Sequence, residues 1–126
     1  MHTVLETESF AAGAKALDLT EEERLEITQS IAKDPTQGDL IVGTGGARKI
    51  RFRKPGTGKS SGYRVITYFA AEDVPVFLLE IFDKNVKINL SKSERNEFKK
   101  ELGSIAEAYR EAMQSRVKQI RKDKVS

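Results

Sequence analysis

The 126-residue sequence predicts an α+β fold, in which a small antiparallel or mixed sheet carries an N-terminal helical hairpin and a long C-terminal helix packed on it. Two short helical patterns precede residue 35, three strand-like runs lie between residues 47 and 82, and one apolar stripe with helical spacing follows residue 91. No internal repeat divides the chain, so we expect a single domain over residues 1–126.

The first 35 residues are expected to form a strand and two helices. Residues 2–6 have the composition of a short strand, and a hydroxyl side chain at position 7 or 9 can cap the helix that follows. Thr20 and Glu23 have the spacing of a capping box at the start of the second helix. This helix should end before Pro35, because proline disfavours the helical conformation in its preceding residue.

Strand patterns follow in four segments. Residues 40–42 run into a glycine-rich turn, and residues 47–54 alternate between cationic and apolar side chains. Aromatic and β-branched residues dominate residues 63–71 and 76–82. The last three segments are expected to form an antiparallel meander, because they follow one another through turns or loops without a helix.

The last element is predicted to be a long helix that begins after Ser91, which has capping-box spacing with Glu94. A single apolar stripe should pack this helix on the sheet. Its members recur every three or four residues: Phe98, Leu102, Ile105, Tyr109, Met113, Val117 and Ile120. Residues from about 116 to 126 form a basic tail, expected to fray or face solvent.

The charge is distributed unevenly along the chain. The net charge is +3, yet residues 1–39 carry nine acidic and three basic residues, whereas residues 40–71 carry seven basic residues and no acidic one. Such a segment attracts polyanions. The chain has no cysteine, which excludes disulfides, thiol nucleophiles and cysteine–zinc sites. It also lacks a membrane-length apolar run and a signal-peptide pattern, so we expect a cytoplasmic protein without a membrane partner.

Strand parity gathers the candidate site residues on one face of the sheet. If helices cover the face that bears Ile50 and Phe52, the opposite face presents cations, aromatic rings and one carboxylate. Guanidinium groups bind phosphate oxygens, and aromatic rings stack on unpaired bases, so this face suits an RNA phosphodiester. Its members are Lys49, Arg51, Arg53, Arg64, Tyr68, Glu80, Phe82 and Lys84. No acid near the cationic strand in sequence would neutralise it.

Several runs of the sequence resemble toxins of the RelE/ParE superfamily, over nearly the whole chain and in the same element order. They are Ala47-Arg-Lys-Ile-Arg-Phe, Ser60-Ser-Gly-Tyr-Arg-Val-Ile, Val76-Phe-Leu-Leu-Glu-Ile-Phe and Asp83-Lys-Asn. The glycine-rich Gly43-Thr-Gly-Gly and Gly56-Thr-Gly-Lys are similar to the HigB branch. The resemblance implies a RelE-like fold and a bacterial type II toxin that cleaves messenger RNA in the ribosomal A site and so inhibits translation.

The resemblance also implies partners and residue roles. The partners are the ribosome, messenger RNA and a cognate helix-turn-helix antitoxin of the HigA type, and the reaction needs no metal or organic cofactor. The catalytic candidates are Lys49, Arg51, Arg64, Lys84 and Tyr68, and the RNA-binding candidates are Arg48, Arg53, Lys54, Lys59 and Phe82. The family's catalytic tyrosine on the final helix has no clear equivalent, and Phe98 lies nearest. For the general base, neutral Lys49 is the first choice and Tyr68 the second.

Two other functions fit the sequence. A ParE-like inhibitor of DNA gyrase would share the fold and need no catalysis, although gyrase binding gives no reason to line one strand face with cations. A basic RNA-binding module without catalysis would use the same residues as the ribonuclease.

Overall fold

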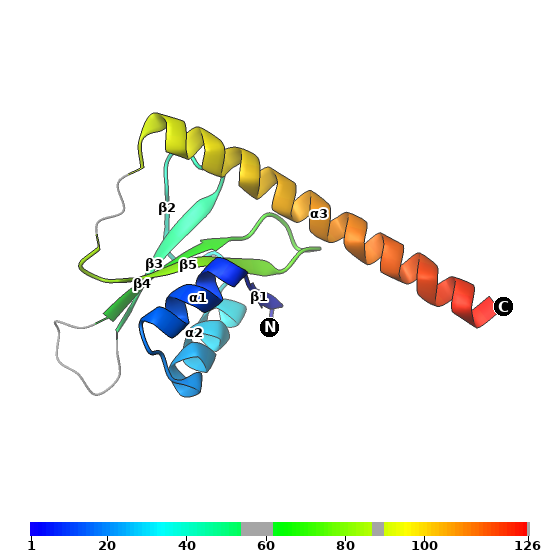
Figure 1. Cartoon of the computed structure of the whole chain (residues 1–126), viewed down its shortest axis with the longest axis horizontal. Coiled ribbons are helices and arrows are strands. Elements are labelled where there is room, and N and C mark those ends of the chain that lie inside the picture. Colours follow the sequence, from blue (N-terminus) through cyan, green and yellow to red (C-terminus); the bar gives the residue numbers. More distant parts are fainter. Residues whose placement is uncertain (54–61, 87–89, 126) are drawn as a thin grey trace.

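Within residues 1–53, 62–86 and 90–125, which the computed structural model describes, five strands form one mixed sheet in the order β1-β5-β4-β3-β2 (Figure 1). The predicted α+β class is confirmed. The strands are β1 (Val4–Glu6), β2 (Asp39–Leu40), β3 (Ala47–Arg53), β4 (Gly62–Tyr68) and β5 (Val76–Asp83). The helices are α1 (Glu8–Ala16), α2 (Glu21–Lys33) and α3 (Lys92–Val125).

Strands β3, β4 and β5 form the predicted antiparallel meander, and β2 pairs antiparallel with β3 at one edge. At the other edge β1 pairs parallel to β5. After β1 the chain passes through α1 and α2 to β2, at the opposite edge of the sheet. In the β3–β4 register Ile50 lies opposite Val65, and Arg51 lies opposite Arg64. The central position of β4 explains its apolar sequence, because helices cover both of its faces along most of its length.

Both N-terminal helices begin at a predicted cap position, and α2 ends where the sequence predicts. The Thr7 hydroxyl accepts a hydrogen bond from the Phe10 N–H at 3.3 Å and caps α1. At the start of α2, Thr20 and Glu23 exchange the two bonds of a capping box, at 3.1 Å each. Helix α2 ends at Lys33, two residues before Pro35.

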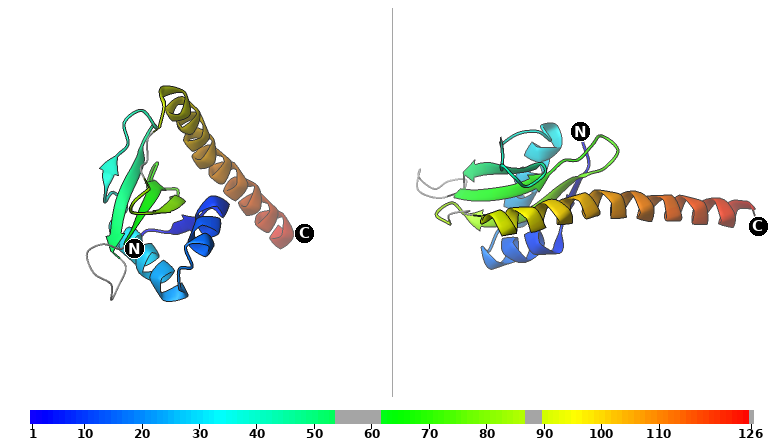
Figure 2. Two further views of the ribbon diagram at one scale, coloured as in Figure 1. Left: turned by 60° about the vertical axis from the view of Figure 1, so that its left-hand side comes forward. Right: turned by 90° about the horizontal axis from the view of Figure 1, so that it is seen from above.

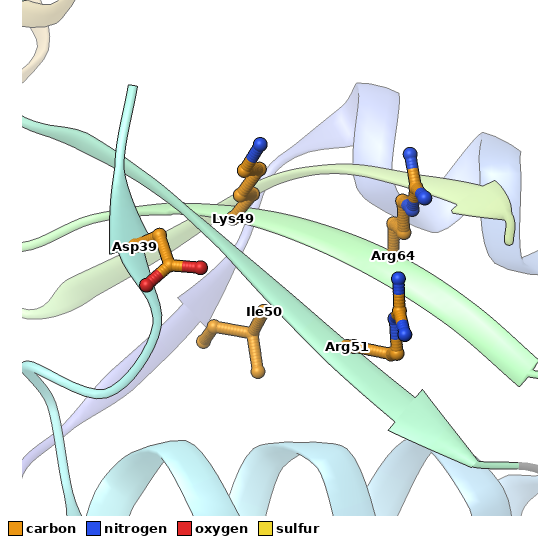
Figure 3. Close-up of a pocket in the computed structure, with 5 residues that line it drawn as sticks. All are labelled: Asp39, Lys49, Ile50, Arg51 and Arg64. Atoms are coloured by element: carbon orange, nitrogen blue, oxygen red, sulfur yellow. The ribbon is translucent and has the colours of Figure 1, made fainter. Parts of the chain in front are cut away.

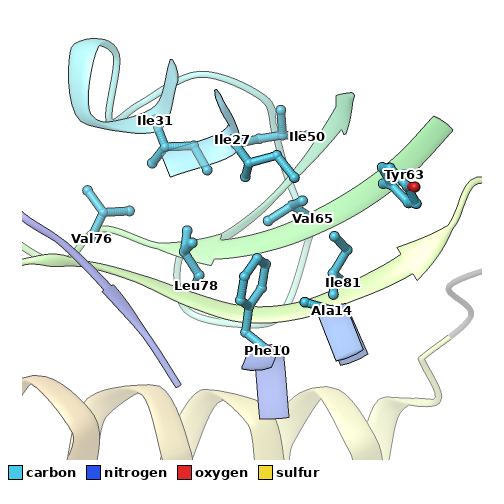
Figure 4. Close-up of a cluster of buried hydrophobic side chains, with 10 residues drawn as sticks. All are labelled: Phe10, Ala14, Ile27, Ile31, Ile50, Tyr63, Val65, Val76, Leu78 and Ile81. Atoms are coloured by element: carbon cyan, nitrogen blue, oxygen red, sulfur yellow. The ribbon is translucent and has the colours of Figure 1, made fainter. Parts of the chain in front are cut away.

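Helices α1 and α2 bury the face of the sheet that bears Ile50 (Figure 4). Phe10 and Ile31 are fully buried there against the apolar side chains of β3, β4 and β5. Helix α1 approaches β5 closely at Gly13, where a Cβ atom would lie 3.0 Å from Ile81 Cγ2 and 3.1 Å from its carbonyl oxygen. A larger residue at position 13 would therefore push the helix away from the sheet.

Helix α3 covers part of the opposite face and then continues past the sheet (Figures 1 and 2). Its first half buries Leu102 and Ala106 against Ala47, Ile66 and Tyr68. Every side chain from residue 111 to residue 123 is exposed. The predicted stripe therefore packs only along its first half, and the basic tail is helical and faces solvent. None of the described helices combines the length and apolar character needed to cross a bilayer.

Two strands, β2 and β4, end two or three residues earlier than the sequence predicts. Strand β2 has only two residues, because Ile41 and the exposed Val42 already lead into the turn that Gly43 begins with a φ of +82°. Strand β4 ends at Tyr68, three residues before the expected end. Strand β5 also contains one extra residue, Leu79, at a register shift opposite the Ile66–Thr67 step. The sequence of β5 alone does not indicate this bulge, because the extra residue depends on how β5 pairs with β4.

Thr7 links α1 to the sheet as well as capping it. Its hydroxyl donates to the Leu78 carbonyl at 2.8 Å. We expect Thr7→Ala to lower the free energy of unfolding by roughly 2 kcal/mol, one part from the cap and one from the lost bond to β5. Thr20→Ala, which loses only an exposed cap, should cost about 1 kcal/mol. Urea denaturation of both variants measures the difference, and an equal or smaller cost for Thr7→Ala would contradict the link.

Candidate nucleic-acid interface

A cationic cavity of about 360 Å³ opens over β2, β3 and β4 (Figure 3). It is lined by Asp39, Lys49, Ile50, Arg51 and Arg64. Figure 3 shows the three cationic side chains extending to the same side of their strands. Lys49 and Arg51 are two residues apart on β3, so their side chains emerge about 7 Å apart, given a rise of roughly 3.3 Å per residue. The predicted parity of β3 is therefore confirmed, and it brings three of the sequence candidates together.

Arg51 and Arg64 form a cross-strand pair of like charges. They are register partners in the antiparallel β3–β4 ladder, which places their Cβ atoms about 5 Å apart on one face. Arg51 is exposed, whereas Arg64 is half-buried and donates from Nη1 to the Val86 carbonyl at 3.4 Å. Neither takes part in an ion pair among the described residues. Like charges in this position destabilise a sheet, so an anion held between the two guanidinium groups would relieve their repulsion.

The cavity also contains an acid that sequence reasoning missed. Asp39 of β2 is the register partner of Lys49. The sequence expectation concerned acids near the cationic strand in sequence, and Asp39 comes close to Lys49 only in the fold. Asp39 is the last residue of the acidic N-terminal segment, and only the two-residue strand β2 brings it beside β3. Across the described part of the chain, no ion pair includes either Asp39 or Lys49.

The two aromatic candidates lie outside the cavity lining. Tyr68 is 9% exposed and packs in the cluster under α3, next to Ala47 in the β3–β4 register. Phe82 is half-buried at the edge of the same cluster and is the register partner of Arg64. Phe82 can therefore present part of its ring beside the arginine pair, whereas Tyr68 is covered by the helix.

The remaining basic candidates lie outside the cavity lining. Arg48 points to the other face of β3 and donates from Nη1 to the Gly38 carbonyl at 3.3 Å. Arg53 is exposed at the end of β3, beside Glu23 and Glu26 of α2. Lys84 is half-buried in the turn after β5. The other two candidates, Lys54 and Lys59, lie outside the described residues.

Two cations of α3 lie near the start of β3, a contact that the sequence did not predict. The side chains of Arg95 and Lys99 lie against the glycine turn before β3, where added Cβ atoms on Gly43 and Gly45 would meet them at 3.2 and 3.0 Å. The Nε atom of Arg95 is buried and has no hydrogen-bond partner within the part of the chain that the structure describes. The glycine turn thus allows α3 to approach the start of β3 closely. Sequence parity could not have found this contact, because it joins separate elements.

Glu80 is the carboxylate that strand parity placed on this face. It lies on β5 and lines a separate cavity of about 150 Å³, which it shares with Ser9 of α1 and Phe98 of α3. Burial raises the pKa of the Glu80 carboxyl, and a hydrogen bond to Ser9 opposes this shift. Glu80 therefore faces α1 and α3 rather than the arginine pair. No group of three or more His, Asp or Glu side chains that could share a metal ion occurs in the described ranges.

Comparison with known proteins identifies a match over nearly the whole chain. Residues 2–125 match the family described as the RelE toxin of the RelE/RelB toxin–antitoxin system. Among solved structures, the chain is similar to a variant of the E. coli toxin RelE in its free state, with 20% sequence identity and a TM-score of 0.44. That alignment covers 64% of this chain and 80% of the E. coli chain. The family match includes the cationic cavity and all of α3.

Proposed function

Because this chain belongs to the RelE toxin family, we propose that it is a growth-inhibiting toxin that cleaves messenger RNA in the A site of bacterial ribosomes, in the cytoplasm. The observation that carries this proposal is the pair Arg51 and Arg64, held on opposing positions of two strands in an open cavity. A plain gyrase-binding surface would not need two guanidinium groups fixed against their mutual repulsion.

The reaction we propose is attack by a ribose 2′-hydroxyl on the adjacent phosphate. The 2′-oxygen forms a bond to phosphorus, the bond to the 5′-oxygen of the next nucleotide breaks, and a 2′,3′-cyclic phosphate remains. Arg51 and Arg64 bind the non-bridging oxygens, whose negative charge grows in the transition state. The strands fix the Cα positions of both arginines, and Arg64 also donates to the Val86 carbonyl, so its guanidinium needs little rearrangement when this charge develops.

Proton transfer is assigned to the other end of the cavity. The attacking hydroxyl loses a proton, and the leaving 5′-oxygen gains one. A carboxylate can accept a proton without first losing one, so we assign the first step to Asp39, whereas an ammonium group suits the second, which we assign to Lys49. Lys49 in its neutral form stays the alternative base. Tyr68 would first have to leave the cluster beneath α3.

The surroundings of the cavity supply further contacts to the messenger. The exposed part of the Phe82 ring lies next to Arg64 and can stack on an unpaired base. Arg53 and Lys84 lie outside the cavity lining and suit flanking phosphates, whereas Arg48 points to the other face of β3 and would need a more distant one. We propose the same use for Lys54 and Lys59, which lie outside the described residues.

The family also implies an antitoxin partner, since its members belong to a toxin–antitoxin system. We propose that this partner is a helix-turn-helix protein of the HigA type, and that the toxin is of the HigB type. An acidic segment of the antitoxin could block access to the cationic cavity, because that surface carries more basic than acidic groups.

We expect rapid cleavage of ribosome-bound messenger and slow or no cleavage of the same RNA free in solution. The cavity binds phosphate, but the ribosome must align the 2′-hydroxyl, and such orientation is worth about 7–11 kcal/mol in favourable cases. Primer extension on translated and naked transcripts measures both rates. Equal rates would contradict ribosome dependence, and no cleavage of either substrate would favour a binding module.

We expect Arg64→Ala to slow cleavage roughly 100- to 1000-fold, the usual cost of removing one preorganised donor. Ribosome binding should weaken much less, because the donor acts mainly on transition-state charge. Arg64→Lys should also be slow, since an ammonium cannot reproduce the planar fork. The control is Arg116→Ala, an exposed residue in the second half of α3. If folded Arg64→Ala cuts as fast as the parent, the phosphate assignment is wrong.

The two proton-transfer assignments are separated by Asp39→Asn and Lys49→Gln. If Asp39 is the general base, we expect Asp39→Asn to lose roughly 100-fold or more in single-turnover rate while messenger occupancy is maintained. A substrate with a good leaving group at the 5′-oxygen should rescue Lys49→Gln but not Asp39→Asn. An Asp39→Asn variant with the parental rate would return the role of base to Lys49.

A further inference from the structure

The second half of α3 has no packing partner within the described residues. Leu102 and Ala106 are 2% and 6% exposed where the helix crosses the sheet. From residue 111 to residue 123 every side chain is exposed, and the helix projects away from the sheet (Figures 1 and 2). Arg110 marks the point of departure, where its guanidinium binds both carboxylate oxygens of Asp73 at 2.7 and 2.9 Å. This ion pair ties the base of the projecting helix to the β4–β5 turn.

The projecting segment is amphipathic although nothing covers it. Met113, Val117 and Ile120 are spaced by four and three residues, so they lie on one face of the helix. Their side chains are 41%, 41% and 52% exposed. A helix that served only as a solvated extension would be polar on all sides. The stripe therefore indicates a face that another chain covers.

A groove of about 310 Å³ runs along one side of this stripe. Met113 and Val117 provide its apolar surface, and Lys118 and Arg121 provide a cationic side, together with Gln114. Residues 111–123 carry four basic and two acidic residues. The ligand that fits must therefore offer apolar side chains for the stripe and negative charge beside them.

A second copy of the chain and an RNA fit this groove less well. Two copies paired along the stripe would bring the cations of the two helices together, because Arg121 follows the stripe residue Ile120 and Arg110 lies one turn before Met113. RNA would pair with the cations but would leave Met113, Val117 and Ile120 without apolar partners. An acidic amphipathic helix satisfies both halves of the groove.

We propose that the stripe and groove of α3 bind an acidic amphipathic helix of the antitoxin, at a site separate from the cationic cavity. The antitoxin as occupant rests on the proposed function above. The cavity lies over β2, β3 and β4, whereas the groove lies on the part of α3 that has left the sheet. Binding at the groove holds the antitoxin on the toxin, so that a second segment covers the cavity at high effective concentration.

The test uses the product of the adjacent small open reading frame, co-expressed with the full-length toxin and then purified for titration. We expect Val117→Gln with Ile120→Gln to weaken binding roughly tenfold or more, since both remove apolar contact but keep good helix propensity. Arg121→Glu should weaken it similarly by reversing a charge in the groove. Lys122→Glu is the matched control: it makes the same charge change at the next position, outside the groove lining, and should bind within about twofold of the parent.

The outcomes separate this inference from the proposed function. Unchanged circular dichroism and single-turnover cleavage in all variants would show that α3 and the cavity are intact. If the adjacent product binds and neutralises the parent, but the groove variants bind it equally well, only the groove inference falls. If no adjacent product binds or neutralises the parent, the toxin proposal falls with it. Concentration-dependent self-association that Val117→Gln abolishes, or a loss confined to ribosome binding, would assign the stripe to another occupant and overturn the inference.

Discussion

The β3–β4 register is the constraint on which the cavity depends. It sets Ile50 against Val65 on the face that α1 and α2 bury, and by the same alternation it sets Arg51 against Arg64 on the opposite face. A slip of one residue would turn the cations of β3 into the apolar core and its apolar side chains into water. The buried cluster under the N-terminal helices thus holds the arginine pair in place, although no residue of that cluster contacts the proposed substrate.

The position of α3 decides which side chains on the second face are accessible. Tyr68 and Arg64 occupy positions of equal parity on β4, yet Tyr68 lies beneath α3 and Arg64 lies beside the open cavity. The helix covers the strand at Ala47 and Ile66 and leaves Lys49 and Arg51 uncovered. Helix α3 therefore divides this face of the sheet into a buried part, which contributes stability, and a solvent-exposed part, which can bind an anion.

Local signals in the sequence were sufficient for most of the fold. The capping box of α2, the helix end before Pro35 and the alternation of β3 are short-range effects, and each was predicted correctly. The cap of α1 was narrowed to positions 7 and 9, and the structure shows Thr7 there. Contacts between elements were not predictable in the same way. Asp39 reaches Lys49 only through the pairing of a two-residue strand, and the cover over Tyr68 depends on where α3 crosses the sheet. The extra residue Leu79 in β5 likewise leaves no period in the sequence that would indicate it.

The two positive surfaces of the chain differ in what they require of a ligand, and this difference separates their roles. The cavity presents two guanidinium groups and one ammonium group beside the Asp39 carboxylate and Ile50, so a phosphate can satisfy its cations. The groove of α3 places Met113 and Val117 next to Lys118 and Arg121, so charge alone satisfies only half of it. Added salt should strongly lower the affinity of the cavity for its ligands, because it screens charge interactions. A ligand of the groove would keep the affinity that comes from its apolar contacts. A partner that uses both surfaces can therefore stay bound to α3 while it competes with RNA for the cavity.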